Sequence, residues 1–179
     1  LDYNIYDPVD SKLVAKMHKA ITIIQLKIEG QLIERHPEWN MNKRDIFRTV
    51  DFNNGTVTIN GKEYSLLDTN FPTVCPENPL LLTDEENELM TVLANSFMHS
   101  ERLNAHMRFL YAKGSMYKTI NGNLLFHGCI PFDENGDLQS INIAGEYYSG
   151  KEMLDKLDEI ANKAYFMQPC KEKNYAVDY

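Results

Sequence analysis

Residues 121–131 read Asn-Gly-Asn-Leu-Leu-Phe-His-Gly-Cys-Ile-Pro and combine a tight turn, an apolar run and an abrupt stop. Asn121 and Gly122 suit the two positive-φ positions of a type I′ turn, so the chain on either side is predicted to pair as a hairpin. Residues 124–130 are almost wholly apolar, which predicts a strand buried on both faces. The segment therefore places a histidine, His127, near the end of a strand that a proline terminates.

The N-terminal part of the chain predicts a long helix. Asp10 or Ser11 can cap it, and it runs to about Arg35 before Pro37. Its apolar residues recur every three or four positions and so share one face: Val14, Met17, Ile21, Ile24 and Ile28. We expect this stripe to face the core and pair with another helix. A dimerisation coiled coil is the alternative, but the pattern lasts too few heptads to favour it.

Three further patterns lie between this helix and the central turn. A second Asn-Gly pair at 60–61 predicts a hairpin of residues 56–59 and 62–66. A proline-rich connector follows that hairpin. The sequence Thr83-Asp-Glu-Glu86 is a capping box, and it predicts a helix from there to near Gly114.

The last third of the chain predicts a loop, a weak strand over residues 138–143 and a final helix that ends near Phe166. Residues 149–152 form a second capping-box pattern at the start of that helix. Its inward positions are Leu154, Leu157, Ile160 and Ala164. Residues 1–9 are expected to form a loop. The fold class is therefore mixed α/β, with long helices plus β-hairpins.

The net charge of −8 disfavours nucleic acid and anionic membranes as partners, because both bind basic surfaces. The three cysteines have no CxxC spacing, which argues against a disulfide framework or a zinc knuckle and favours the cytoplasm. No apolar run reaches transmembrane length. The chain begins at Leu1 without Met, so we expect a piece of a longer protein.

The segment around His127 is the strongest candidate for chemistry. Sheet enzymes often place ligands at the end of a central strand, and a neutral imidazole binds manganese, iron or zinc well. Gly128 would let the backbone approach an ion closely. A hydrogen-bonded core histidine is the alternative reading of the same position. Cys129 is expected to be a small buried residue rather than a nucleophile, since no base lies beside it.

Other candidates are weaker. His99 and His106 are two helical turns apart, too far to share one ion unaided, and Arg102 and Arg108 favour a solvated helix face. The chain contains no DxH, GDxxDRG or GNH segment, no Walker loop and no GxSxG elbow. Because one ligand cannot form an open catalytic metal site, the chain is expected to be catalytically incomplete by itself.

Many ordered segments nevertheless resemble one family over nearly the whole chain. They include residues 11–20, 23–25, 71–73, 96–97, 99–101, 109–110, 113–117, 121–131, 148–151 and 164–166. In these segments the chain is similar to the middle portion of the class III (Firmicutes-type) fructose-1,6-bisphosphatases, members of the calcineurin-like metallophosphoesterase superfamily. The related protein phosphatases usually carry His-Gly-Gly where this chain has Cys129 in the third place.

The resemblance implies that His127 is one ligand of a dinuclear metal centre. Two ions, expected to be Mn²⁺, would activate water for attack on the C1 phosphate of fructose 1,6-bisphosphate. The remaining metal motifs would lie outside this chain, and no catalytic or substrate-binding residue is assigned within it. Residues 1–113 would form a mostly helical insertion with one hairpin. Residues 114–179 would form part of a metallophosphoesterase-type sheet sandwich. A homo-oligomer is also expected.

A different class of function is left open. Residues 10–110 could form a non-catalytic regulatory or oligomerisation module, with His127 in a structural role. Metal motifs flanking this segment in its reading frame would favour the enzyme, whereas a short frame beginning near Leu1 would favour the module.

Overall fold

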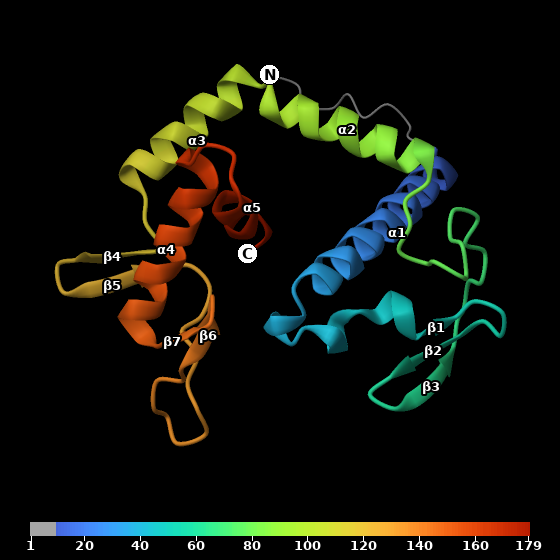
Figure 1. Ribbon diagram of the computed structural model, residues 1–179, viewed down its shortest axis with the longest axis horizontal. Helices are drawn as coiled ribbons and strands as arrows, with labels where there is room; N and C mark the ends of the chain where they lie inside the picture. Colours follow the sequence, from blue (N-terminus) through green and yellow to red (C-terminus); the bar gives the residue numbers. More distant parts are fainter. Residues whose placement is uncertain (1–9) are drawn as a thin grey trace. The chain divides into compact units, whose positions relative to one another are not determined.

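The computed structural model describes residues 10–179 and combines helices with three small antiparallel sheets (Figure 1). The expected mixed α/β class is confirmed. The chain divides into two compact units, Leu1–Asn95 and Ser96–Tyr179, which are described separately below. The loop expected over residues 1–9 lies outside the described residues. The division expected between residues 113 and 114 concerns the family architecture and stays a prediction.

The first unit joins a long helix to a small sheet through three 3₁₀ turns. The sheet has the antiparallel order β1-β2-β3, and Asn60 and Gly61 have φ of 52° and 77° at the turn between β2 and β3. The predicted hairpin is therefore confirmed, while the short β1 was not expected. The elements are α1 (Ser11–Arg35), η1 (Pro37–Trp39), η2 (Asn42–Arg44), η3 (Ile46–Thr49), β1 (Val50–Asp51), β2 (Thr56–Ile59), β3 (Lys62–Ser65) and α2 (Asp84–Met98).

Helix α1 has the predicted bounds, and the Asp10 carboxylate caps it by accepting a bond from the Lys12 amide. The prediction of its core-facing stripe was wrong for this chain. Met17 and Ile21 are 60% and 46% exposed, and among the described residues only Ile24 of the stripe is buried. The buried face instead consists of Ile23, Lys27, Gly30 and Ile33, together with Ile24 at its edge. Hydrophobic periodicity missed this face because a lysine and a glycine occupy its centre.

Lys27 is buried because an ion pair compensates its charge. Its Nζ donates to Glu86 Oε2 at 2.7 Å and to the Thr73 carbonyl at 2.6 Å. Glu86 also accepts a bond from the Thr83 amide and donates its own amide to the Thr83 hydroxyl, so the predicted capping box is confirmed. Burial would raise the pKa of Glu86, but the bonds from Lys27 and Thr83 outweigh it and the pKa is lowered. One carboxylate thus links α1 to the start of α2.

The predicted helix over 83–114 is interrupted. Helix α2 ends at Met98, and α3 (Glu101–Lys113) begins after Ser100, whose backbone is extended and whose hydroxyl accepts a bond from the Leu103 amide at 3.3 Å. Ser100 is a good N-cap residue, and the apolar period on either side concealed this second helix start.

The second unit is organised around α4. Its core consists of Ile143, Met153, Leu154, Ile160 and Ala176, with Leu157 and Ala164 packed against it as half-buried residues. The inward face predicted for the final helix is therefore confirmed in outline. The elements are α3, β4 (Tyr117–Ile120), β5 (Asn123–Phe126), β6 (Ile141–Ile143), β7 (Glu146–Tyr148), α4 (Gly150–Phe166) and α5 (Lys171–Asp178).

Two details of this unit differ from expectation. Ser149 makes no side-chain capping bond at the start of α4, where Gly150 has φ of 50° instead of continuing a capping-box geometry. Helix α5 was not predicted because its sequence is polar. Ala176 joins the core on α4, and Lys163 Nζ lies 2.8 Å from Glu172 Oε1, so tertiary contacts support this short helix. None of the helices within residues 10–179 is long and apolar enough to cross a membrane.

Candidate metal-ligand position after strand β5

His127 follows β5 directly, as predicted, but it is exposed and the strand is not buried. All four residues of β5 are exposed, with Leu124 at 47%, Leu125 at 52% and Phe126 at 43%. A strand is covered on both faces only when other elements pack on each face. Within the described part of the chain β5 pairs with β4 alone, in a two-stranded sheet. The prediction of a doubly buried strand is therefore wrong for this chain, and the apolar residues form an open surface.

The hairpin is held in place at the end that carries His127. Asn121 and Gly122 form the turn with φ of 52° and 76°, and Tyr117 pairs with Phe126 at the opposite end. Tyr117 packs against the core of the second unit, and its hydroxyl donates to Asp155 Oδ1 at 3.0 Å. Because Phe126 directly precedes His127, the anchored end of the hairpin fixes the backbone position of His127.

The chain beyond His127 is anchored as well. Ile130 packs against the core on α4, and the Pro131 carbonyl accepts a bond from the Gln139 amide at 3.0 Å. Between the two anchors Gly128 has φ of 100°, and a Cβ added there would meet no atom within 4 Å. The backbone conformation, not crowding, thus requires glycine. His127 and Gly128 form a short exposed link between two fixed points.

Asp155, which accepts the bond from Tyr117, lies on α4. Lys151 pairs with Asp155, and this bond, together with that from Tyr117, holds the pKa of the Asp155 carboxyl below its usual value. The bond of Lys151 to Asp155, and after it that to Tyr117, raise the pKa of Lys151 to about 12. The Tyr117 hydroxyl therefore donates to a carboxylate that stays ionised throughout the neutral range.

The described residues supply one candidate metal ligand, His127, but not a complete metal site. The imidazole of His127 is open to an ion, and Gly128 leaves space beside the backbone. Residues 10–179 contain no group of three or more His, Cys, Asp or Glu side chains placed to hold a metal ion. Any complete site that includes His127 needs ligands from elsewhere.

The other candidates lie on different elements. His99 follows α2, whereas His106 and the exposed Arg102 and Arg108 are on α3, whose solvated face the sequence indicated. Cys129 is exposed, so the expectation of a buried small residue is wrong. The tyrosine that anchors the hairpin was not singled out from sequence. Its signal is its place at the first position of β4, directly across from the residue before His127.

An exposed histidine and a positive-φ glycine directly after an anchored strand are typical of proteins in which a side chain at a strand end binds a ligand. Comparison with known proteins identifies the group more closely. The family described as Firmicute fructose-1,6-bisphosphatase matches residues 2–179, and the chain belongs to that family.

Curated relatives are similar along nearly the whole chain. A class 3 fructose-1,6-bisphosphatase of Clostridium tetani is 49% identical over 173 residues, which cover 96% of this chain and 26% of the relative. Those of Listeria innocua and Fusobacterium nucleatum are 46% and 49% identical, over 97% and 93% of this chain and 27% and 26% of the relatives. The chain thus spans about a quarter of these relatives' length. No solved structure matches it.

Proposed function

We propose that this chain is part of an enzyme that hydrolyses the C1 phosphate of fructose 1,6-bisphosphate in gluconeogenesis. The family match over residues 2–179 and the names of the curated relatives support this activity. The missing catalytic motifs agree with it, because the chain corresponds to about a quarter of those relatives.

We further propose that His127 is a ligand of a dinuclear metal centre in the family-length protein. The observation that carries this proposal is the exposed imidazole after β5, held between the Tyr117 anchor and the Ile130 anchor. Divalent ions, expected to be Mn²⁺, would supply Lewis acidity toward water and the phosphate oxygens. His127 would bind one ion through a ring nitrogen, and Gly128 would allow the backbone to approach that ion.

The isolated chain is expected to have no phosphatase activity. One imidazole does not hold two ions, and the described residues offer no further ligand cluster. The remaining ligands, the sugar-phosphate contacts and a sheet on which β5 could pack would come from the other three quarters of the protein. A cytoplasmic location and a homo-oligomeric assembly are proposed with the enzyme, the former because all three cysteines are free.

The test measures hydrolysis of fructose 1,6-bisphosphate with Mn²⁺ by the family-length protein and its His127→Ala variant. Mutation of a residue that hydrogen-bonds to a metal ligand typically reduces metal affinity or activity by about 10–100-fold. Loss of the ligand itself should therefore reduce activity by at least about 100-fold. His106→Ala is the matched control, because it removes an exposed helical imidazole. Bound Mn²⁺ is counted in each purified variant.

A drop in both activity and bound Mn²⁺ that is confined to His127→Ala supports the assignment. Activity like that of the unmodified protein in His127→Ala would refute the ligand role and favour the regulatory or assembly module over residues 10–110. If the unmodified family-length protein does not hydrolyse the sugar bisphosphate, the proposed activity itself is wrong.

A further inference from the structure

Helix α1 carries two apolar faces on opposite sides. Ile23 and Ile33 lie on the face that packs into the first unit, around Gly30. Successive residues turn by about 100°, which places Met17 and Ile21 on the other side of the helix axis. Both faces belong to the same helical stretch, so α1 does not have the single apolar stripe of an ordinary surface helix.

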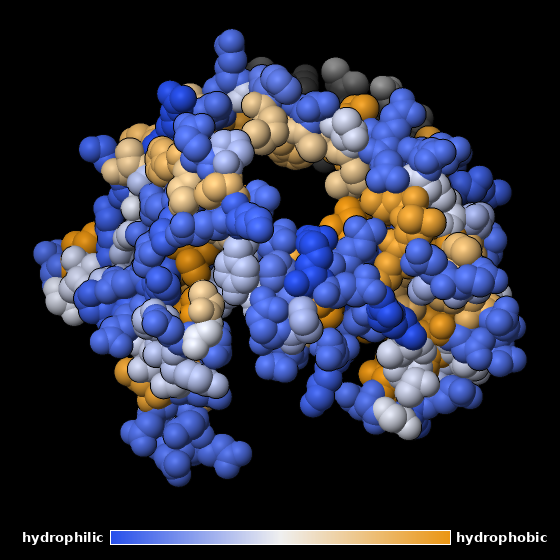
Figure 2. Space-filling view, viewed as in Figure 1, coloured by the Kyte–Doolittle hydropathy of each residue, from blue (hydrophilic) through white to orange (hydrophobic). Residues whose placement is uncertain are grey.

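The second face is apolar along most of its length and ends in a charged residue, Arg35, which follows Met17 by about five full helical turns. Leu13, Met17 and Ile21 are 53%, 60% and 46% exposed, and hydrophobic side chains are visible over α1 in Figure 2. Its polar members are His18, Gln25 and, at the end of the helix, Arg35. The face as a whole consists of Leu13, Val14, Met17, His18, Ile21, Gln25, Ile28, Leu32 and Arg35, of which Val14, Ile28 and Leu32 are half-buried.

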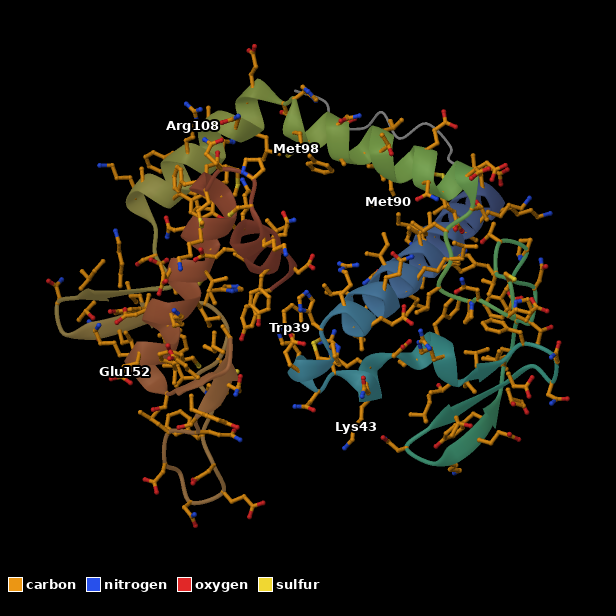
Figure 3. All side chains as sticks on the ribbon, viewed as in Figure 1. Trp39, Lys43, Met90, Met98, Arg108 and Glu152 are labelled. Atoms are coloured by element: carbon orange, nitrogen blue, oxygen red, sulfur yellow. The ribbon has the colours of Figure 1, made fainter. Side chains whose placement is uncertain are left out.

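The same face continues into a groove toward the C-terminal half of α1. Ile21, Ile28 and Leu32 line an open groove of about 540 Å³. Met41 and Met90 complete its wall, the latter from α2 as labelled in Figure 3. The charged groups at this groove neutralise each other, because Arg44 lies 2.9 Å from Glu29. The groove therefore favours an apolar, uncharged occupant over a charged ligand.

A second copy of the chain is a poor match for this surface. A 25-residue helix is about 37 Å long and about 10 Å wide, so its face offers roughly 370 Å². Stable interfaces bury about 800 Å² on each partner, about twice this area. Packing within one polypeptide has no such requirement, since the covalent link already holds the surfaces together. About three quarters of the relative's length lies outside the part that this chain covers, which is long enough to supply a covering segment.

We propose that α1 is an interior helix of the family-length protein, and that an apolar surface from the remaining part of the same polypeptide covers its second face. A helix that is apolar on opposite sides is stable when both sides are buried. This inference rests on family membership and relative length and not on the proposed catalytic activity.

The test is the thiol labelling rate of a family-length Met17→Cys variant whose native cysteines have been replaced. The cysteine should react at least about 100-fold more slowly in native buffer than in urea, as expected for a buried site. Ile21→Cys serves as a second variant if the first does not fold. Labelling is repeated over a wide range of protein concentrations.

Protection that does not change with concentration supports the proposal. Rates that are equal in buffer and urea, in a protein whose circular dichroism shows it to be folded, would overturn it. Protection that disappears on dilution would show that a second copy covers the face, which also overturns it. Because labelling does not depend on turnover, a protected but inactive protein contradicts only the proposed activity.

Discussion

Replacing Lys27 by Met tests whether the buried ion pair holds the first unit together. Lys27 is fully buried, and its partner Glu86 is 7% exposed. The substitution preserves much of the side-chain volume while it removes the charge, the bond to Glu86 and the bond to the Thr73 carbonyl. Glu86 then remains buried as a carboxylate that keeps its bonds from the Thr83 amide and the Thr73 side chain.

The expected loss in the free energy of unfolding is about 3 kcal/mol, at the low end of the 3–5 kcal/mol seen when one partner of a buried pair is removed. The low end applies because the Thr83 bond still stabilises the Glu86 carboxylate. A Lys27→Met, Glu86→Leu double variant should recover part of this loss, since an apolar pair avoids the cost of a lone buried charge. It should not recover all of it, because the capping bond to Thr83, typically about 1 kcal/mol, is also lost.

Urea unfolding followed by tryptophan fluorescence measures this effect. Trp39 is the chain's single tryptophan and stacks on His36 in the first unit, with ring centroids 4.0 Å apart. Lys19→Met is the matched control. Lys19 is on the same helix as Lys27 and pairs with Asp68, but these two side chains are 32% and 59% exposed. The control should cost about 0.2–1 kcal/mol, as other exposed pairs do. Equal losses for the two variants would refute the reasoning.

Four further outcomes are expected. The pKa of Glu86 is lowered in the folded state, so its contribution to stability is present above its unfolded pKa and is lost as the pH falls through the folded value. In an acid titration below about pH 4.5, the Glu86→Gln variant should therefore lose less unfolding free energy than the unmodified chain. Gly30→Ala places a Cβ 2.5 Å from a Leu80 methyl group and should lower the unfolding free energy by about 1–3 kcal/mol in urea titrations. Gly122→Ala, at φ of 76° in open space, should cost about 1 kcal/mol in thermal unfolding, through backbone strain alone. His127→Ala should change the free energy of unfolding of the 179-residue chain by less than about 0.5 kcal/mol in urea titrations, and a larger loss would indicate that the imidazole has a structural role.

Local chemistry in the sequence determined the elements of this chain that depend on near neighbours. A type I′ turn requires positive φ at two adjacent residues, which Asn-Gly adopts readily, so the two Asn-Gly hairpins were predictable. The Asp10 cap and the Thr83–Glu86 box likewise involve residues two or three positions apart. His127 could be placed after a strand for the same reason. The assignment of a metal to it depended on the family resemblance, because the residues by themselves left a core histidine as the alternative.

Only the tertiary structure decided which face of α1 is buried and whether β5 is covered. Burial is a property of contacts between distant segments: Lys27 is buried because Glu86 and Thr73 come to it from elsewhere in the chain. The apolar residues of β5 are exposed, and within the described residues this strand belongs to a sheet of only two strands, in which it pairs with β4. Periodicity records which residues are apolar, but it does not record which partner reaches them, or whether that partner belongs to this chain.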